Sequence, residues 1–244
     1  MKGKVIKKLY AIDGTCSGGC VDWPASKYGP YPNSNVKRLY KEYWSEVHGG
    51  LWEGPKHGVT GYGSTAIVFS VVDKVCEHFK RFATSEDRDA CKSESFKVYL
   101  LGWSRGGVIA VEVARSLLRV GCFNKTKIPV EWIGLFDAVN QTYPSWDDPN
   151  LPENVKVVSH AKKSDNGRNL WGWGLKVFPG MDYTSSAGKV YEKKFWKEPR
   201  SSNDKKEPTS HGEIGLGWSV GQWSNGDDAI RWMRDEVSTH TDLL

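Results

Sequence analysis

The sequence predicts an α/β protein with a mostly parallel central sheet and helices on both of its faces. Three observations lead to this prediction: short buried strands alternate with amphipathic helices, polar residues follow several of the strands, and a tight glycine-rich turn joins one strand directly to a helix. Such alternation is typical of parallel sheets, whose reactive groups gather at the carboxyl ends of the strands. With 244 residues and no internal repeat or linker, the chain is expected to form a single domain over residues 1–244.

Hydrophobic periodicity places the elements in order along the chain. Runs of apolar residues indicate buried strands, and apolar residues three and four apart indicate amphipathic helices. The N-terminal part is predicted to contain a strand at Lys8–Ile12, a helix from its N-cap Ser34 to a stop at Gly49, a glycine-rich connection at Gly49–Ser64 and a helix with an apolar face from Val68 to Phe82. The central part is predicted to contain strands at Phe96–Leu101, Val130–Phe136 and Val155–Ser159, and a helix at Val108–Val120 closed by Gly121.

The C-terminal part is less regular. From Ala161 to Ser210 the pattern breaks into glycines, aromatic residues and a polar stretch, which we interpret as an irregular excursion. Its aromatic residues are candidates for a lid or an acyl cleft, namely Trp171, Trp173, Phe178, Tyr183, Phe195 and Trp196. A final helix is expected from about Asp227 to His240, capped by Ser224 or Asn225.

Composition narrows the classes of partner. The 34 Lys and Arg exceed the 29 Asp and Glu by five and are spread along the chain, so we expect a solvated surface and no nucleic-acid partner. The twelve Trp suit a membrane interface or an acyl cleft as well as ordinary core packing. No apolar run is long enough to cross a bilayer or to form a signal-peptide core. We therefore expect cytoplasmic synthesis, with any secretion by a route that needs no cleaved signal.

The cysteines give no recognisable pattern. The five residues Cys16, Cys20, Cys76, Cys91 and Cys122 are odd in number and irregular in spacing, which predicts neither a complete disulfide framework nor a metal site. We expect free thiols, and a pair between the first two in an oxidising compartment is the alternative. No metal and no cofactor is expected.

The segment Gly102-Trp103-Ser104-Arg105-Gly106 has the Gly-x-Ser-x-Gly pattern between a predicted strand and a predicted helix. This context is the one expected of a nucleophile elbow, in which small residues on either side of the serine let the flanking backbones approach closely. The helix that follows aims its N-terminus at the serine, which favours negative charge there. Ser104 is therefore the predicted nucleophile, and a purely structural serine is the alternative.

A serine hydroxyl needs a base within hydrogen-bond reach, and a carboxylate that orients this base. His211, in the loop ahead of the final helix, is the predicted base, and His160 at the end of a strand is the alternative. Asp137, which follows the strand after the elbow, is the predicted acid; it is otherwise interpreted as a capping or loop aspartate. The other candidate acids are Asp165, Asp182 and Glu213.

A tetrahedral oxyanion needs two N–H donors. One is predicted to be the backbone of Arg105, directly after the nucleophile. The other is predicted to come from Gly14 and Thr15 at the end of the first strand, where glycine lets the backbone approach a substrate and the threonine can add its hydroxyl. Asp-Gly-Thr is also an ordinary turn sequence, which is the alternative interpretation.

Five short segments occur together in a characteristic order. They are Asp13-Gly14-Thr15, the elbow Gly-Trp-Ser-Arg-Gly-Gly, Gly134-Leu135-Phe136-Asp137-Ala138-Val139, Ser159-His160-Ala161 and His211-Gly212-Glu213-Ile214-Gly215. From about Leu9 to Met233 the chain thereby resembles the α/β-hydrolase family that includes the type VI secretion phospholipase effectors. Trp103 and Gly107 depart from the Phe and Ala that are usual in this family.

This resemblance implies an α/β-hydrolase fold and a serine esterase or lipase with Ser104, Asp137 and His211 as its triad. The expected substrate is a lipid, a phospholipid or a small ester, cleaved through an acyl-enzyme. Peripheral contact with a membrane is expected, and an effector would also have an immunity or secretion partner protein. The alternative is a non-catalytic module that binds a membrane or a protein on the hydrolase scaffold.

Overall fold

The computed structural model describes residues 5–18, 33–43, 48–57, 61–82, 95–122, 125–140, 146, 148–164, 181–197, 207–209, 211–216 and 225–243. The strands are β1 (Ile6–Ile12), β2 (His48–Trp52), β3 (Phe96–Trp103), β4 (Val130–Phe136), β5 (Val157–Lys163), β6 (Lys189–Lys197) and β7 (Glu207–Pro208). The helices are α1 (Asn35–Glu42), α3 (Ser64–Phe82), α5 (Arg105–Arg119), α6 (His211–Leu216) and α7 (Asn225–His240).

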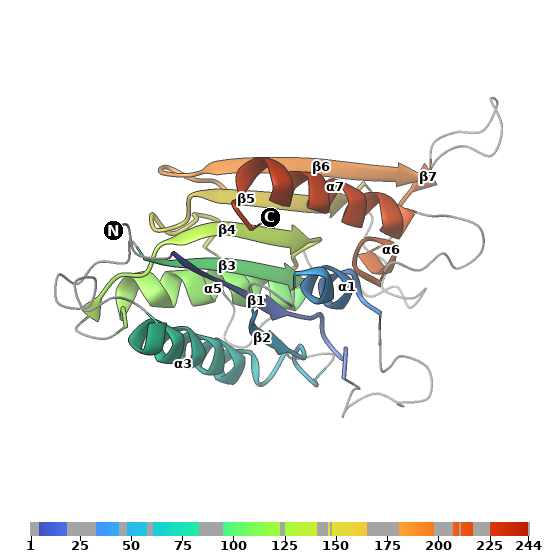
Figure 1. Ribbon diagram of the computed structural model, residues 1–244. Helices are drawn as coiled ribbons and strands as arrows, with labels where there is room; N and C mark the ends of the chain where they lie inside the picture. The colour runs from blue at the N-terminus through green and yellow to red at the C-terminus, as the bar shows by residue number, and fades with distance from the viewer. Residues whose placement is uncertain are drawn as a thin grey trace.

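The strands form one sheet in the order β2-β1-β3-β4-β5-β6-β7, and all neighbouring pairs are parallel except the last. One apolar layer packs α3 and α5 against one face of this sheet, and a second layer packs α1 and α7 against the other. Figure 1 shows the parallel strands pointing toward the side of the molecule on which α6 lies. The predicted α/β fold with a mostly parallel sheet and helices on both faces is therefore confirmed.

Local sequence explains why the main elements form. Ser34 is the N-cap of α1, and its hydroxyl accepts a hydrogen bond from the Lys37 N–H, as predicted. The strands β3 and β4 are buried along most of their length, in keeping with their runs of apolar residues. Two ion pairs, Arg38–Asp227 at 2.8 Å and Glu42–Arg234, join the neighbouring helices α1 and α7.

Three strands were not predicted, β2, β6 and the two-residue β7. β2 occupies the start of the expected glycine-rich connection and pairs with β1 at the edge of the sheet. β6 lies within the expected irregular excursion of 161–210 and pairs in parallel with β5 over seven positions. The prediction of an irregular excursion is thus wrong for residues 189–197, because a strand near the edge of a sheet needs few apolar residues and β6 is rich in lysine.

The expected lid residues divide into three groups. Tyr183 and Phe195 are buried in the two apolar layers, so they are core residues, and Trp196 is 44% exposed on β6. Trp171, Trp173 and Phe178 lie outside the described residues. Among the described residues, no helix is both long enough and apolar enough to span a membrane.

The expectation of free thiols is wrong for Cys76 and Cys122. They form a disulfide with their Cα atoms 5.0 Å apart, and it joins α3 to the residue that follows the turn at the end of α5. Cys16 is disulfide-bonded as well, whereas Cys20, its expected alternative partner, lies outside the described residues. The 46-residue separation of Cys76 and Cys122 crosses an entire helix and strand, so spacing alone could not reveal the pair.

We predict that the double variant Cys76→Ala/Cys122→Ala loses about 4 kcal/mol in its free energy of unfolding, because the cross-link restricts the unfolded chain. The measurement is equilibrium unfolding in urea under oxidising conditions. The double variant keeps the disulfide of Cys16, so the comparison isolates the α3–α5 link. A change below about 1 kcal/mol would mean that this cross-link contributes little.

Candidate active site

The central strand β3 ends in a sharp turn at Ser104, and α5 begins at the next residue. Ser104 has φ +57° and ψ −127°, a backbone conformation that costs a non-glycine residue strain and that persists only where the surroundings enforce it. Its N–H donates to the Phe136 carbonyl at 3.0 Å, and its carbonyl accepts from Val139 N–H at 3.2 Å. The turn is therefore shorter than Gly102–Gly107, the range predicted for it, and the hydrogen bond to the last residue of β4 holds it in place.

The two elbow glycines are required by close backbone contacts. A Cβ atom on Gly102 would lie 2.4 Å from the Gly106 carbonyl oxygen, and one on Gly106 would lie 2.3 Å from the Ile12 carbonyl oxygen. Any larger residue would push the elbow away from β1 or open the turn itself. The glycines thus allow the serine to stand at the start of a helix, where the dipole favours negative charge.

Asp137 follows β4 directly, in the left-handed region with φ +43°. Its carboxylate is almost completely buried and accepts two hydrogen bonds. Oδ2 lies 2.7 Å from His211 Nδ1, and Oδ1 lies 3.2 Å from the backbone nitrogen of Lys163. Burial raises the pKa of a carboxyl group, but the interactions with His211, His160 and the Lys163 backbone N–H together outweigh burial and hold the pKa of Asp137 below its usual value. Asp137 is therefore a carboxylate at neutral pH.

His211 is the first residue of the short helix α6, and not part of a loop as predicted. Its side chain is about one third exposed, in contrast to that of Asp137. Asn35, at the start of α1, holds α6 through a hydrogen bond from Nδ2 to the Ile214 carbonyl at 2.8 Å, and the Ile214 side chain is buried. His211 thereby meets Asp137, which lies 74 positions earlier in the sequence, in hydrogen-bond contact.

Trp103 fills a slot beside the histidine. The centre of its ring lies 5.6 Å from that of His211. A Cβ atom on Gly14 would lie 2.3 Å from the indole, and one on Gly215 would lie 1.8 Å from its Nε1. The indole is therefore inserted between the loop after β1 and helix α6, a role that the sequence analysis did not recognise.

The expected oxyanion residues differ in their availability. Arg105 opens α5, and its guanidinium contacts the His57 carbonyl at 2.9 Å and the Thr15 hydroxyl at 3.4 Å. The Gly14 N–H donates to the Asp13 carboxylate at 2.8 Å. The Gly14 nitrogen is thus already engaged, which argues against its prediction as an oxyanion donor and favours Thr15.

The Asp13 carboxylate organises this loop. It is completely buried, accepts a hydrogen bond from the Ser34 hydroxyl at 2.9 Å and lies 3.4 Å from Lys37 Nζ. Burial raises the pKa of Asp13, and the three donors Gly14, Ser34 and Lys37 oppose this effect. The start of α1 therefore fixes the loop that contains Gly14 and Thr15.

The alternative candidates lie in other surroundings. His160 is not at the end of a strand as predicted but within β5, fully buried, where its Nε2 accepts a hydrogen bond from the Ala138 N–H. Asp182 is exposed and paired with Lys162, which keeps the pKa of Asp182 below its usual value. Asp165 and the side chain of Glu213 lie outside the described part of the structure.

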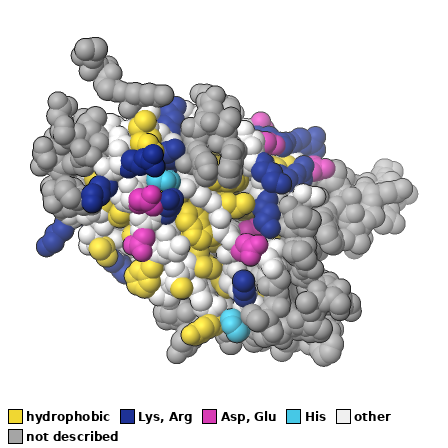
Figure 2. Space-filling view, turned by 60° about the horizontal axis from the view of Figure 1, so that its bottom comes forward, with side chains coloured by type: hydrophobic (Ala, Val, Ile, Leu, Met, Phe, Trp, Pro, Cys, Tyr) yellow, Lys and Arg dark blue, Asp and Glu magenta, His cyan; other side chains and the backbone are white. Residues whose placement is uncertain are grey.

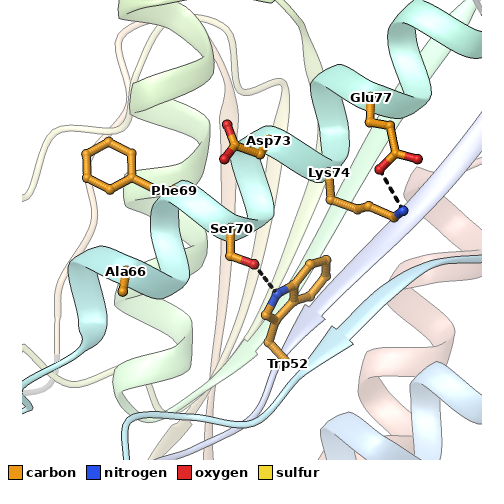
Figure 3. A pocket seen from close by; sticks show the side chains of 7 residues that line it. All are labelled: Trp52, Ala66, Phe69, Ser70, Asp73, Lys74 and Glu77. Carbon is orange, nitrogen blue, oxygen red and sulfur yellow. Dashed lines mark hydrogen bonds and ion pairs between the residues drawn. The ribbon is translucent and has the colours of Figure 1, made fainter.

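A separate open groove lies over α3 and the end of β2. Figure 3 shows its lining of Trp52, Ala66, Phe69, Ser70, Asp73, Lys74 and Glu77. Two pairs of its polar groups are bonded to each other, Trp52 Nε1 to the Ser70 hydroxyl at 3.0 Å and Lys74 to Glu77 at 2.8 Å. Because it contains none of the elbow, acid or base residues, we locate the candidate active site by the geometry of Ser104, Asp137 and His211.

The face around this groove is mixed in character. Figure 2 shows small apolar groups separated by acidic and basic side chains. Both signs of charge are interspersed on this face, as expected of a solvated surface.

Within the described ranges, no group of three or more His, Cys, Asp or Glu side chains is placed to hold a metal ion.

No model of a known protein family matches the chain, and no curated protein matches it. Among solved structures, an uncharacterised protein from Pseudomonas aeruginosa is 15% identical, with a TM-score of 0.51 over 96% of this chain and 46% of that chain. The Tle1 effector bound to the VgrG spike of the type 6 secretion system is 16% identical, with a TM-score of 0.35 over 90% of this chain and 53% of that chain. An acetyl xylan esterase is 12% identical, with a TM-score of 0.30 over 93% of this chain and 98% of that chain.

These comparisons bear on the fold alone. The chain spans about half the length of the first two structures, and of the three structures named here the Pseudomonas protein has a TM-score above 0.5. At 15% identity this likeness extends to the arrangement of strands and helices. The assignment of a chemical role must therefore come from the geometry of the residues.

We predict that Gly215→Ala displaces α6, because the added methyl group would overlap the Trp103 indole. The expected results are a loss of about 1 to 3 kcal/mol in the free energy of unfolding and loss of the downfield Nδ1 proton resonance of the His211–Asp137 pair in NMR spectra. Trp103→Phe removes the part of the ring that carries Nε1, so the double variant Trp103→Phe/Gly215→Ala should recover this resonance. An unchanged spectrum in Gly215→Ala alone would contradict the close packing of the Trp103 indole against Gly215.

Proposed function

We propose that the chain is a serine hydrolase that cleaves carboxylic esters through an acyl-enzyme intermediate. One observation carries the proposal: the buried Asp137 carboxylate accepts a hydrogen bond from His211 Nδ1 at 2.7 Å, directly after β4, the strand that pairs with the one ending in the Ser104 elbow. With a proton on Nδ1, the His211 imidazole has Nε2 free as the base for a serine hydroxyl. Ser104, His211 and Asp137 thus have the roles of nucleophile, base and orienting acid.

The reaction follows from these roles. Ser104 Oγ attacks the ester carbonyl while His211 Nε2 takes its proton, and the carbonyl oxygen becomes an oxyanion. His211 then gives the proton to the departing alcohol oxygen as the carbon–oxygen bond of the ester breaks, which leaves the acyl group on Ser104. A water molecule, deprotonated by His211, attacks the acyl carbon, and the acid is released with the proton returned to Ser104.

The oxyanion is assigned to two backbone donors, the N–H groups of Arg105 and Thr15. Arg105 starts α5, so its N–H is directed out of the helix end beside Ser104. Gly14 is left out because its N–H donates to Asp13. The Arg105 guanidinium donates to the Thr15 hydroxyl and to the His57 carbonyl, and it thereby connects α5 to the loop that contains Thr15.

We further propose lipid or phospholipid acyl esters as the natural substrates. Support comes from the sequence resemblance and from the tryptophan-rich composition, with 12 Trp in 244 residues. Contact with a membrane surface, and an immunity or secretion partner protein, are predictions that follow only if this substrate is correct. The disulfide between Cys76 and Cys122 favours work in an oxidising compartment, which fits export after cytoplasmic synthesis.

We predict that Ser104→Ala lowers the turnover of p-nitrophenyl butyrate by about 10⁴-fold or more, because the variant has no nucleophile. Ser70→Ala is the matched control, since this exposed hydroxyl on α3 contacts Trp52 in the groove and should be dispensable. Full activity in Ser104→Ala would reject the proposed function. The absence of any turnover in the unaltered chain would favour the non-catalytic binding module.

We predict that the chain also releases fatty acid from phosphatidylcholine in mixed micelles, measured by titration of the acid formed. The same Ser104→Ala variant shows whether release depends on the elbow. Rapid cleavage of butyrate esters without release of fatty acid would restrict the function to small esters and remove the lipid substrate from the proposal.

A further inference from the structure

His160 is a fully buried histidine that the proposed reaction does not use. It lies within β5, and its ring faces the turn that follows β4. The Ala138 N–H donates to His160 Nε2 over 3.1 Å, so Nε2 must be the unprotonated nitrogen of the ring. The proton of the neutral imidazole is therefore on Nδ1, which lies 3.6 Å from Glu192 Oε1.

His160 contacts the turn that begins at Asp137, the proposed acid of the triad, whose backbone is strained. Asp137 has φ +43°, and such a conformation requires the surroundings to hold it in place. Two backbone hydrogen bonds do so, from the Asp137 N–H to the Ala161 carbonyl at 2.7 Å and from the Val139 N–H to the Ser104 carbonyl at 3.2 Å. The bond from Ala138 to His160 secures the residue between them, and in this case the acceptor is a side chain.

Charged groups surround the other side of the ring. Glu192 of β6 faces Nδ1, and Lys162 of β5 lies between Glu192 at 3.3 Å and Asp182. The contact with His160 is the largest cause that keeps the pKa of Glu192 below its usual value, so it faces the ring as a carboxylate. The ring of Tyr183 lies 6.0 Å away, centre to centre. A carboxylate beside Nδ1 favours the tautomer with its proton there, which leaves Nε2 as the acceptor.

We propose that His160 is a positioning residue: as a neutral imidazole it accepts the Ala138 N–H and thereby holds the Asp137 turn so that the carboxylate meets His211. The inference rests on the proposed function, because it acts through Asp137 on the base. No proton is transferred through His160. Its loss would rotate or loosen the turn and misplace His211, with little effect on how a substrate binds.

The test compares His160→Gln with His160→Leu in the full chain. A glutamine Oε1 can accept the Ala138 N–H in the place of Nε2, whereas leucine fills similar space without an acceptor. We expect His160→Gln to keep kcat for p-nitrophenyl butyrate within about threefold, and His160→Leu to lower kcat about 100-fold with KM nearly unchanged, as for a misplaced catalytic group. Wild-type kcat in His160→Leu would overturn the proposal. So would equal losses in the two variants when both melt at the wild-type temperature.

His78→Leu is the matched control. His78 is a second buried histidine, on α3, and its Nδ1 lies 2.9 Å from the Tyr10 hydroxyl of β1. Its loss should lower the melting temperature and leave kcat unchanged. A drop in kcat as large as that of His160→Leu would show that any buried histidine has this effect and would overturn the specific role of His160.

One further measurement is independent of activity and needs no variant. In NMR spectra of the unaltered chain with ¹⁵N-labelled histidine, His160 should show a protonated Nδ1 and an unprotonated Nε2 at neutral pH. A protonated Nε2 would overturn the proposal even if the chain hydrolyses esters. If the chain hydrolyses no ester but His160 shows the expected tautomer, the proposed function fails and the structural contact stands, so the two failures are distinguishable.

Discussion

The hydrogen bond between Asp137 and His211 is the constraint on which the rest of the candidate site depends. It joins the end of a central strand to a six-residue helix that lies 74 positions later in the sequence. A buried carboxylate without partners would be costly, and this one is stabilised by the histidine and by the Lys163 N–H. In the proposed reaction, the elbow depends on this pair, because a serine hydroxyl needs an oriented base.

Helix α1 links both halves of the site. Ser34 and Lys37 near its start hold the Asp13 carboxylate, which in turn fixes the Gly14 N–H and the loop that follows β1. Asn35, between them, holds α6 through the Ile214 carbonyl. The first turn of a single helix therefore positions both the loop that contains a proposed oxyanion donor and the helix that contains the proposed base.

Much of the fold was predictable because periodicity reports burial directly. The strands before Asp13, Ser104 and Asp137 and the helix at 64–82 follow from local apolar patterns. Asp137 and His211 were selected through the order of the motifs, and their catalytic roles stay predictions. The strand β2 was missed because Gly49 and Gly50 are typical of a loop, and β6 because its lysines hide the alternation. Both lie toward the edges of the sheet, where burial is weaker.

The parts that the sequence could not reveal are contacts between distant segments. Nothing near Trp103 indicates that its indole fits between Gly14 and Gly215, and nothing near Cys76 indicates its bond to Cys122. His160 was expected at a strand end, but the register of β5 against β4 places it opposite Leu135, two residues before Asp137. The sequence therefore predicted the candidate catalytic residues, whereas the contacts that hold these residues in place are visible only in the structure.

The most direct test of the whole account is covalent labelling with a fluorophosphonate, followed by mass spectrometry of the digested protein. Such a probe reacts with a serine only where a base activates it and an oxyanion site accepts the phosphoryl oxygen. The account predicts a single labelled residue, Ser104, and no labelling when His211 is replaced by alanine. A native, folded chain that stays unmodified, or one labelled equally well without the histidine, would contradict it.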